Sequence, residues 1–198
     1  MAKKIRKYKI SIRPHAVFRT LKKVLSMDTL TEDMEKKVQE EIAKSQSLIV
    51  PSAVYHSFAK PETPEALAGL WESAPNNALA MAMMAVTIGT DIEKEIEASR
   101  ISNGGKRALI LDGIARESLE QSLNFVAKLL SDEAKAESCE LTPISPVEAT
   151  ILPAVLNFLE SEKAGILVEG EAQISPMFTI ASYCFWSPLP KSRNVKNR

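Results

Sequence analysis

Few residues of this chain have the types and the spacing that catalysis or metal binding requires. The sequence holds two cysteines and two histidines, which stand far apart: Cys139, Cys184, His15 and His56. Because a metal site usually draws several such ligands from positions a few residues apart, we expect no metal site and two free thiols. No nucleophile is paired with a recognisable base, so we assign no catalytic residue and leave open whether the protein is an enzyme.

Two polar positions lie in unusual surroundings. Asp112 falls inside an apolar helical pattern, and a buried carboxylate needs partners, so Asp112 either lies at the helix margin or accepts hydrogen bonds from backbone or a base. A functional and a structural role fit it equally well. Ser145, Pro146 and Glu148 have the spacing of a capping box with proline at the first helical position, which predicts that a helix begins there. Pro153 is expected to restart or kink that helix.

Composition indicates one soluble domain. The chain has 198 residues, 45% of them hydrophobic and 25% charged, which suits a single domain and excludes a mainly disordered chain. No apolar run approaches the roughly 20 residues needed to cross a bilayer, and the lysine-rich N-terminus lacks the apolar core of a signal peptide. We therefore expect a cytoplasmic protein without membrane contact, forming one domain over residues 1–198 with basic extensions at residues 1–23 and 189–198.

The net charge of zero hides a separation of charge along the chain. Residues 1–23 hold nine Lys or Arg and no acid, and the last eight residues hold four more bases. Every acid lies between Asp28 and Glu171. The basic ends could attract polyanions, or they could be solvated arms that fold back over an acidic body.

Hydrophobic periodicity predicts a mixture of strands and helices. The strands are expected at residues 7–13, 48–58, 78–88, 166–168 and 177–186. The helices are expected after Pro14 and Thr31, at residues 65–71, after Thr90, at residues 106–130 and from Ser145 onward. Long helices mixed with separated strands are typical of an α+β domain.

Helix ends are expected from local signals. The hydroxyls of Thr31 and Thr90 should cap the helices that follow them, and the acids after Thr31 suit the positive end of that helix dipole. The Asn-Gly-Gly of residues 103–105 should end the helix after Thr90 through a left-handed residue.

Helix faces are expected from the apolar spacing. Ile92, Ile96 and Ile101 should form one buried stripe. The helix at residues 106–130 carries the most apolar residues and should be central, with residues 117–121 on an exposed face.

The order of these elements resembles the activation domain of vitamin B12-dependent methionine synthase and its free-standing relatives. The resemblance covers roughly residues 80–186 and rests on short motifs in a fixed order. The motifs are Val86-Thr87-Ile88-Gly89, the acidic helix Asp91 to Ile96, Ala108-Leu109-Ile110-Leu111-Asp112, Ser145-Pro146, Ala164-Gly165-Ile166-Leu167 and Pro176-Met177-Phe178-Thr179. The resemblance implies a twisted, mostly antiparallel sheet packed with helices.

In that family the domain binds S-adenosylmethionine and docks on a cobalamin-carrying domain, so that an oxidised cobalt, reduced by one electron from a flavodoxin-like donor, can be remethylated. For this chain the resemblance implies S-adenosylmethionine as ligand and cobalamin carried by a partner, either a corrinoid protein or a cobalamin-dependent methyltransferase. It also implies substrate-binding roles for Ser145, Pro146, Glu148 and Asp112. An acidic redox donor could be drawn to the basic ends.

This chain differs from the family at the ligand-binding loop. With Ser145-Pro146 placed on the Ser-Pro of the family, Pro143 takes the position of an arginine, Val147-Glu148 that of Gly-Tyr and Ala149-Thr150 that of Gly-Asp. Loss of the arginine removes a charged partner for the ligand's carboxylate, and loss of the glycine prevents close backbone approach. These differences predict that binding of S-adenosylmethionine is altered or lost.

An alternative function follows from the charge separation alone. The protein would then be a non-catalytic interaction module whose basic ends bind nucleic acid or another polyanion. Such binding would weaken steeply with added salt, because phosphate contacts release counterions. No aromatic stacking surface accompanies the lysines, which argues against single-stranded nucleic acid.

Overall fold

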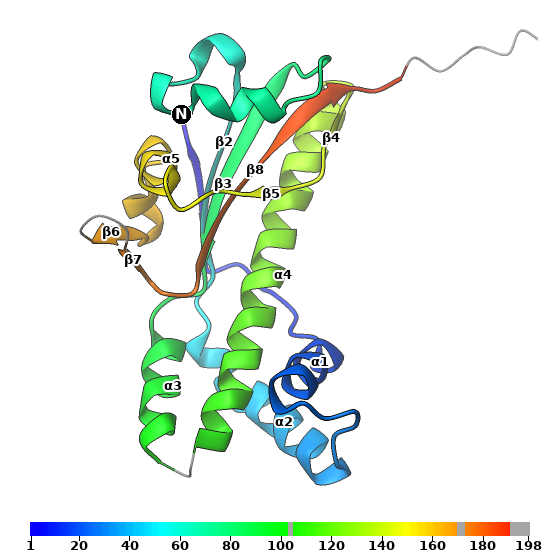
Figure 1. Ribbon diagram of the computed structural model, residues 1–198, viewed down its shortest axis with the longest axis vertical. Coiled ribbons are helices and arrows are strands. Elements are labelled where there is room, and N and C mark those ends of the chain that lie inside the picture. Colours follow the sequence, from blue (N-terminus) through cyan, green and yellow to red (C-terminus); the bar gives the residue numbers. More distant parts are fainter. Residues whose placement is uncertain (103–104, 170–172, 191–198) are drawn as a thin grey trace, which may run out of the picture.

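A β-sheet occupies one half of the elongated molecule and a group of helices the other (Figure 1). The computed structural model describes residues 1–102, 105–169 and 173–190. The sheet is antiparallel, with strand order β1-β2-β3-β8-β4 and short β5 paired with β8. Its strands are β1 (Lys3–Arg6), β2 (Ser52–Ala59), β3 (Ala80–Thr87), β4 (Cys139–Leu141), β5 (Ser145–Pro146) and β8 (Thr179–Pro188). A separate hairpin joins β6 (Leu167–Glu169) to β7 (Gln173–Ser175).

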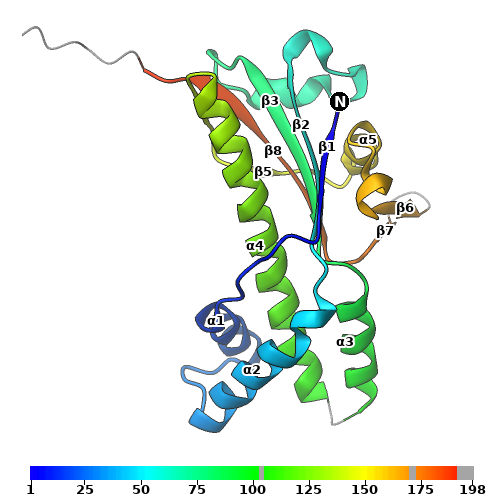
Figure 2. The ribbon, with the colours of Figure 1, turned by 180° about the vertical axis from the view of Figure 1, so that it is seen from behind.

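Helices pack on both faces of the sheet and at one end of it (Figures 1 and 2). The α-helices are α1 (Pro14–Leu25), α2 (Glu32–Ser45), α3 (Asp91–Ile101), α4 (Lys106–Ala136) and α5 (Leu152–Phe158). Short 3-10 helices are η1 (Gln46–Leu48), η2 (Lys60–Glu62), η3 (Glu65–Ser73) and η5 (Ser161–Ala164). This arrangement confirms the predicted α+β fold with an antiparallel sheet packed with helices.

The central strand is β3, which pairs with β2 and β8 along its whole length. Residues 81–87 are all buried, and Met81 and Met83 face the core on one side of the sheet while Met84 faces the other. A strand covered on both faces has a continuous apolar sequence, which is why this strand was predictable. Gly89 then turns the chain into α3 at φ +84°, a conformation that favours glycine.

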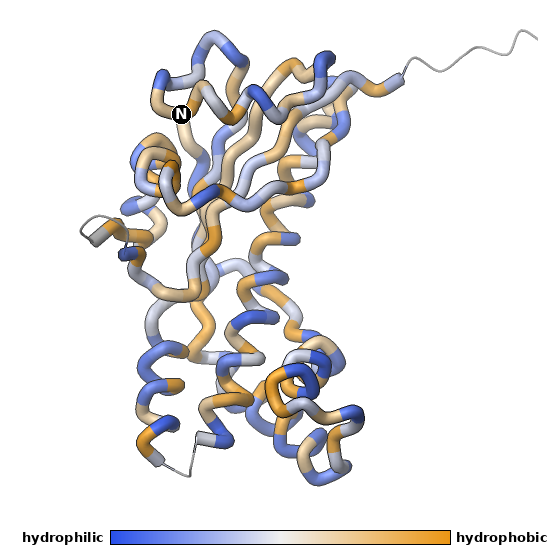
Figure 3. Tube along the Cα trace, in the orientation of Figure 1, coloured by the Kyte–Doolittle hydropathy of each residue, from blue (hydrophilic) through white to orange (hydrophobic). Residues whose placement is uncertain are grey.

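One face of the sheet is covered by α4. Val126 and Leu130 of this helix are fully buried against Met84 of β3 and Ala53 of β2. Hydrophilic and hydrophobic residues alternate along α4, as an amphipathic helix requires (Figure 3). The predicted central helix is confirmed, and it continues six residues beyond the predicted end, to Ala136.

The opposite face is covered by α5, η3 and η5. Leu156 and Leu159 pack with Leu67 and Trp71 of η3 over the apolar side of β2, β3 and β8. The indole Nε1 of Trp71 donates a hydrogen bond to Thr63 Oγ1 at 2.8 Å, which satisfies the polar atom of this buried ring. The predicted short helix at residues 65–71 is therefore a 3-10 helix that supports one side of the sheet.

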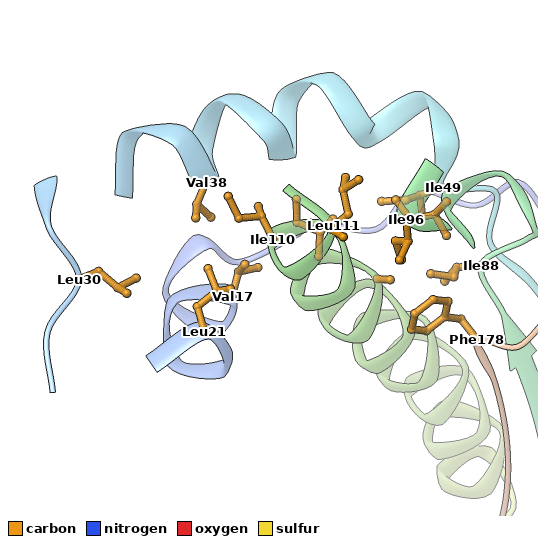
Figure 4. Packing of buried hydrophobic residues seen from close by; sticks show 14 residues of the cluster. Val17, Leu21, Leu30, Val38, Ile49, Ile88, Ile96, Ile110, Leu111 and Phe178 are labelled. Atoms are coloured by element: carbon orange, nitrogen blue, oxygen red, sulfur yellow. The ribbon is translucent and has the colours of Figure 1, made fainter. Parts of the chain in front are cut away.

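A third apolar core holds α1, α2, α3 and the first half of α4 together. Leu21 of α1, Val38 of α2 and Ile110 of α4 point into the space between these helices (Figure 4). Gly113 lets α1 approach α4 closely, because a Cβ at this position would lie 3.3 Å from Cγ1 of Val17. The helical end is thus a small bundle joined to the sheet through α4.

The predicted strand at residues 7–13 is wrong. The strand lies earlier, at Lys3–Arg6, and the next residue, Lys7, has a left-handed φ of 55°. Residues 8–13 are irregular, yet Ile10 and Ile12 still pack against the helical core. Their alternation therefore reflected burial of an extended connection rather than pairing in a sheet.

Three further local expectations differ from the structure. Ile101 is 86% exposed, because it is the last residue of α3 and extends past the helices that bury Ile92 and Ile96. Neither Thr31 nor Thr90 makes a side-chain capping hydrogen bond, although α2 and α3 begin directly after them.

Some predicted features lie outside the described residues. These are Asn103 and Gly104 of the expected helix end, the turn around residues 170–172, and residues 191–198 of the basic C-terminal extension. The neighbouring Gly105 is described and has the expected left-handed φ, +77°, directly before α4.

Candidate functional site

Ser145 and Pro146 form strand β5 rather than the start of a helix. They lie antiparallel to β8, opposite Tyr183 and Ser182, and α5 begins only at Leu152. The predicted capping box is therefore wrong. The open edge of β8 offers backbone hydrogen bonds to this segment, and that tertiary partner outweighs the local capping pattern.

Hydrogen bonds to β8 hold the segment on both sides of β5, two between backbone groups and one to the hydroxyl of Thr142. Thr142 N donates to Phe185 O at 2.9 Å, and Phe185 N donates to Thr142 Oγ1 at 2.9 Å. Val147 N donates to Ala181 O at 3.1 Å. The two prolines of the segment lack an N–H, which an edge strand tolerates. The chain leaving β5 is thus fixed in position where it turns toward α5.

This turn closes a surface cavity of about 360 Å³ between the β5–α5 segment and η3. The cavity is lined by Pro146, Glu148 and Ile151 from the segment, Tyr183 from β8, and Ala66, Gly69, Leu70, Glu72 and Ser73 from η3. Its volume lies in the usual range for small-molecule sites, roughly 300 to 1,000 Å³. Two predicted binding residues, Pro146 and Glu148, therefore line one cavity, and Ser145 directly precedes Pro146 in β5.

The polar groups of the cavity suit a ligand that carries positive charge or hydrogen-bond donors. Glu72 and Glu148 supply carboxylates from opposite sides, and no basic residue is among its lining residues. The hydroxyls of Ser73 and Tyr183 lie 3.3 Å apart. Gly69 leaves open space, because nothing lies within 4 Å of an added Cβ. These groups can bind and orient a ligand, but they include no nucleophile paired with a base.

Asp112 lies elsewhere, on α4, and is not among the residues that line this cavity. Its carboxylate accepts hydrogen bonds from Arg116 Nε at 2.7 Å and Nη2 at 3.4 Å, one helical turn away. This bond and the accompanying charge attraction raise the pKa of Arg116. The neighbouring base expected for Asp112 is therefore Arg116, and a role for Asp112 in binding stays a prediction.

Glu117 is the polar residue that sequence reasoning misplaced. It was expected on an exposed face, but it is 4% exposed and accepts hydrogen bonds from Arg13 Nε at 2.7 Å and Gln121 Nε2 at 3.0 Å. The hydrogen bond to Glu117 raises the pKa of Arg13. The pair ties the segment before α1 to α4. The sequence signal for this pair was the nine bases without an acid in residues 1–23, since such bases need acidic partners elsewhere in the chain.

The cavity residues from η3 and β8 were also missed by sequence reasoning. Glu72, Ser73 and Tyr183 carry no motif, and they reach the cavity only because η3 and β8 pack beside the β5–α5 segment. Apolar spacing could predict the elements but not this juxtaposition.

The cysteine and histidine side chains, which could take part in chemistry, are buried or isolated. Cys139 and Cys184 are free thiols, as expected, and the structure shows both buried; burial raises the pKa of the Cys184 thiol to about 12. Burial, and next the nearby N-terminal ammonium, lower the pKa of His56. Within the described ranges, no group of three or more His, Cys, Asp or Glu could hold a metal ion. A helix long and apolar enough to cross a membrane is likewise not found in the part of the chain that the structure describes.

The fold and this cavity define an α+β protein with a ligand-sized site beside its central sheet. The fold is similar to that of the MetH reactivation domain, in a crystal structure bound to AdoHcy, with a TM-score of 0.64 at 12% sequence identity. The similarity covers 96% of this chain and 80% of that chain. No family model matches the sequence, and no curated protein matches it either. At this identity the similarity shows the shared fold, which agrees with the architecture that the resemblance implied.

Proposed function

We propose that the protein is an activation-domain homologue that supports reductive reactivation and remethylation of a cobalamin-bearing partner, with altered binding of S-adenosylmethionine. The observation that carries this proposal is the 360 Å³ cavity closed by Pro146 and Glu148, in the segment where the resemblance places the ligand loop. Similarity to a reactivation domain bound to AdoHcy supports a ligand of that class. When bound, S-adenosylmethionine would supply the methyl group and leave as AdoHcy, and the cobalt of the partner's cobalamin would accept that methyl group after a separate donor had supplied one electron.

The charges of the cavity suggest how this ligand would lie. Glu72 and Glu148 would attract the amino group and the sulfonium of S-adenosylmethionine, and Leu70 and Ile151 offer apolar contact to its adenine. The ligand's carboxylate would lack a cationic partner, because Pro143 stands where the family has arginine. We therefore expect binding that is weak and depends on the two carboxylates.

Isothermal titration of the full chain with S-adenosylmethionine tests this site. Glu148→Gln should weaken binding about two- to fivefold, the effect of one partly solvated ion pair. Glu140→Gln is the matched control, since Glu140 is exposed on β4 and does not line the cavity. AdoHcy should bind more weakly than S-adenosylmethionine, because it lacks the positive sulfonium. Pro143→Arg should strengthen binding by restoring a partner for the ligand's carboxylate.

Absence of heat with S-adenosylmethionine, for both the natural chain and Pro143→Arg, would refute the proposed ligand. The partner is tested separately, by mixing the protein with a cobalamin-loaded methyltransferase domain. Docking should change the visible absorbance of the bound cobalamin, because contact with the protein alters the surroundings of the cobalt. An unchanged spectrum together with no co-elution would refute the docking role.

The alternative, an interaction module with basic ends, concerns other surfaces. In the described part of the N-terminal region, residues 3–6 form β1 and residues 14–25 form α1, so many of these bases belong to packed elements. Lys3 pairs with Glu133 at 2.8 Å, and Arg13 pairs with Glu117. These contacts favour the structural reading of the N-terminal charge. Binding of a DNA duplex that weakens steeply with salt would instead support the alternative.

A further inference from the structure

A second cavity, of about 680 Å³, lies at the helical end, between α1, α2 and the first turns of α4. None of its lining residues lines the cavity beside β5. The helices that form it meet in the core shown in Figure 4, where Leu21 of α1 and Ile110 of α4 point into the same space. The volume is ample for a small organic molecule.

The inner surface of this cavity is mainly apolar. Its apolar lining residues are Leu21 and Leu25 of α1, Met27 of the α1–α2 connection, Met34 of α2, and Leu109 and Ile110 of α4. Met27 is 39% exposed and Leu109 is 37% exposed, so apolar surface continues from the cavity to its opening. A ligand that covered these side chains would remove apolar area from water, which favours binding.

Several charged groups near the cavity already have partners. Arg107 Nε donates to Glu41 Oε2 at 2.9 Å, and the same guanidinium contacts Glu95 and Ser99. Glu40 also lies within ion-pair distance of a base, Lys44, at 3.9 Å. These charges neutralise one another, so they leave little attraction for a ligand.

Two lysines of the lining remain, one on each side of the cavity. Lys37 of α2 and Lys106 of α4 form no ion pair with any described residue. The first turn of α4 contains no acid, so its N-terminal dipole adds to the positive potential at Lys106. The remaining acid of the lining, Asp33, lies in the first turn of α2, where the helix dipole of α2 stabilises its charge.

We propose that this cavity binds a small amphipathic anion, with its apolar body against Leu25, Met34 and Ile110 and its carboxylate or sulfonate between Lys37 and Lys106. Apolar burial supplies most of the affinity, and the two lysines select the sign of the charge. This site is independent of the proposed S-adenosylmethionine site, because the two cavities share no residue.

The test uses 1-anilinonaphthalene-8-sulfonate, an aromatic sulfonate whose fluorescence rises in an apolar site. The full-length folded chain should bind one molecule with saturation. Decanoate should displace this probe, whereas decyltrimethylammonium, with the same alkyl chain and a positive charge, should displace it much less. Equal displacement by the two would overturn the charge selection and with it the proposal.

Variants locate the site. Lys37→Gln and Lys106→Gln should each weaken probe binding about two- to fivefold, and together about tenfold, because each removes one partly solvated ion pair. Lys36→Gln is the matched control: Lys36 is exposed on the same turn of α2 and does not line the cavity. Unchanged binding in the double variant, or binding that requires partial unfolding by urea, would overturn the proposal. Glu148→Gln should leave probe binding unchanged, so failure of either proposed site can be told from failure of the other.

Discussion

Leu111 and Leu109 of α4 give a direct test of how the helical end is packed. Both belong to the apolar pattern of this helix, but residues two apart on an α-helix point about 200° away from each other. Leu111 is fully buried in the core between α1, α2 and α3, whereas Leu109 is 37% exposed. The same substitution at the two positions should therefore lower the free energy of unfolding by different amounts.

Leu111→Ala should lower the free energy of unfolding by roughly 3 to 4 kcal/mol, because it loses the burial of the side chain and leaves a cavity in a close-packed core. Leu109→Ala should cost less than about 1.5 kcal/mol, since part of that side chain is already in contact with water. Against a typical total stability of about 5 to 15 kcal/mol, the first loss is large.

Urea denaturation followed by far-ultraviolet circular dichroism measures both losses. The slope of the free energy against urea should stay the same in the two variants, so that the midpoints report stability. Equal losses for the two variants, or a larger loss for Leu109→Ala, would refute the assigned packing of α4.

Three further outcomes follow from titratable side chains that are buried or partly buried. Glu117→Gln should lower the free energy of unfolding by roughly 1 to 2 kcal/mol, because it weakens a buried charge-assisted hydrogen bond. Glu120→Gln, at a side chain that is 52% exposed, should change the free energy of unfolding little. Equal thermal midpoints for the two variants would contradict this. The raised pKa of the Cys184 thiol, about 12, predicts that a thiol reagent at pH 8 labels the unfolded chain rapidly and the folded chain slowly, as mass spectrometry would show. The pKa of His56 is lowered in the folded state, so the unfolded chain binds more protons as the pH falls from about 6.5, and stability should decline over that range. His56→Phe should reduce this decline, measured as the unfolding midpoint against pH, and an unchanged decline in this variant would contradict the assignment.

Long apolar patterns made much of the fold predictable from sequence. Strand β3 and helix α4 were expected because each has an apolar pattern long enough to fix its type. Their order, together with short motifs near Gly89 and Ser145, also indicated the architecture that the structural comparison supports. Local sequence patterns were sufficient to predict an element wherever the buried residues followed the spacing of that helix or strand.

The candidate site was predictable only in part. Pro146 and Glu148 were expected to act together and do line one cavity, but Pro146 lies in the edge strand β5 and Glu148 follows it, and neither begins a helix. The carboxylate of Glu72 and the hydroxyl of Tyr183 come from elements distant in sequence. No local pattern encodes that contact, because it arises from how η3 and β8 pack on the same side of the sheet.

The sequence by itself determined the elements with long apolar patterns, such as β3 and α4, and the positions of the charged residues along the chain. Tertiary structure alone decided that Glu117 is buried against Arg13, that Ser145 pairs with β8, and that Lys37 and Lys106 lie on two sides of one cavity. The physical reason is that hydrophobic periodicity and capping are local, acting over a few residues of chain. Ion pairs, sheet edges and cavities depend instead on which distant surfaces meet when the apolar cores close.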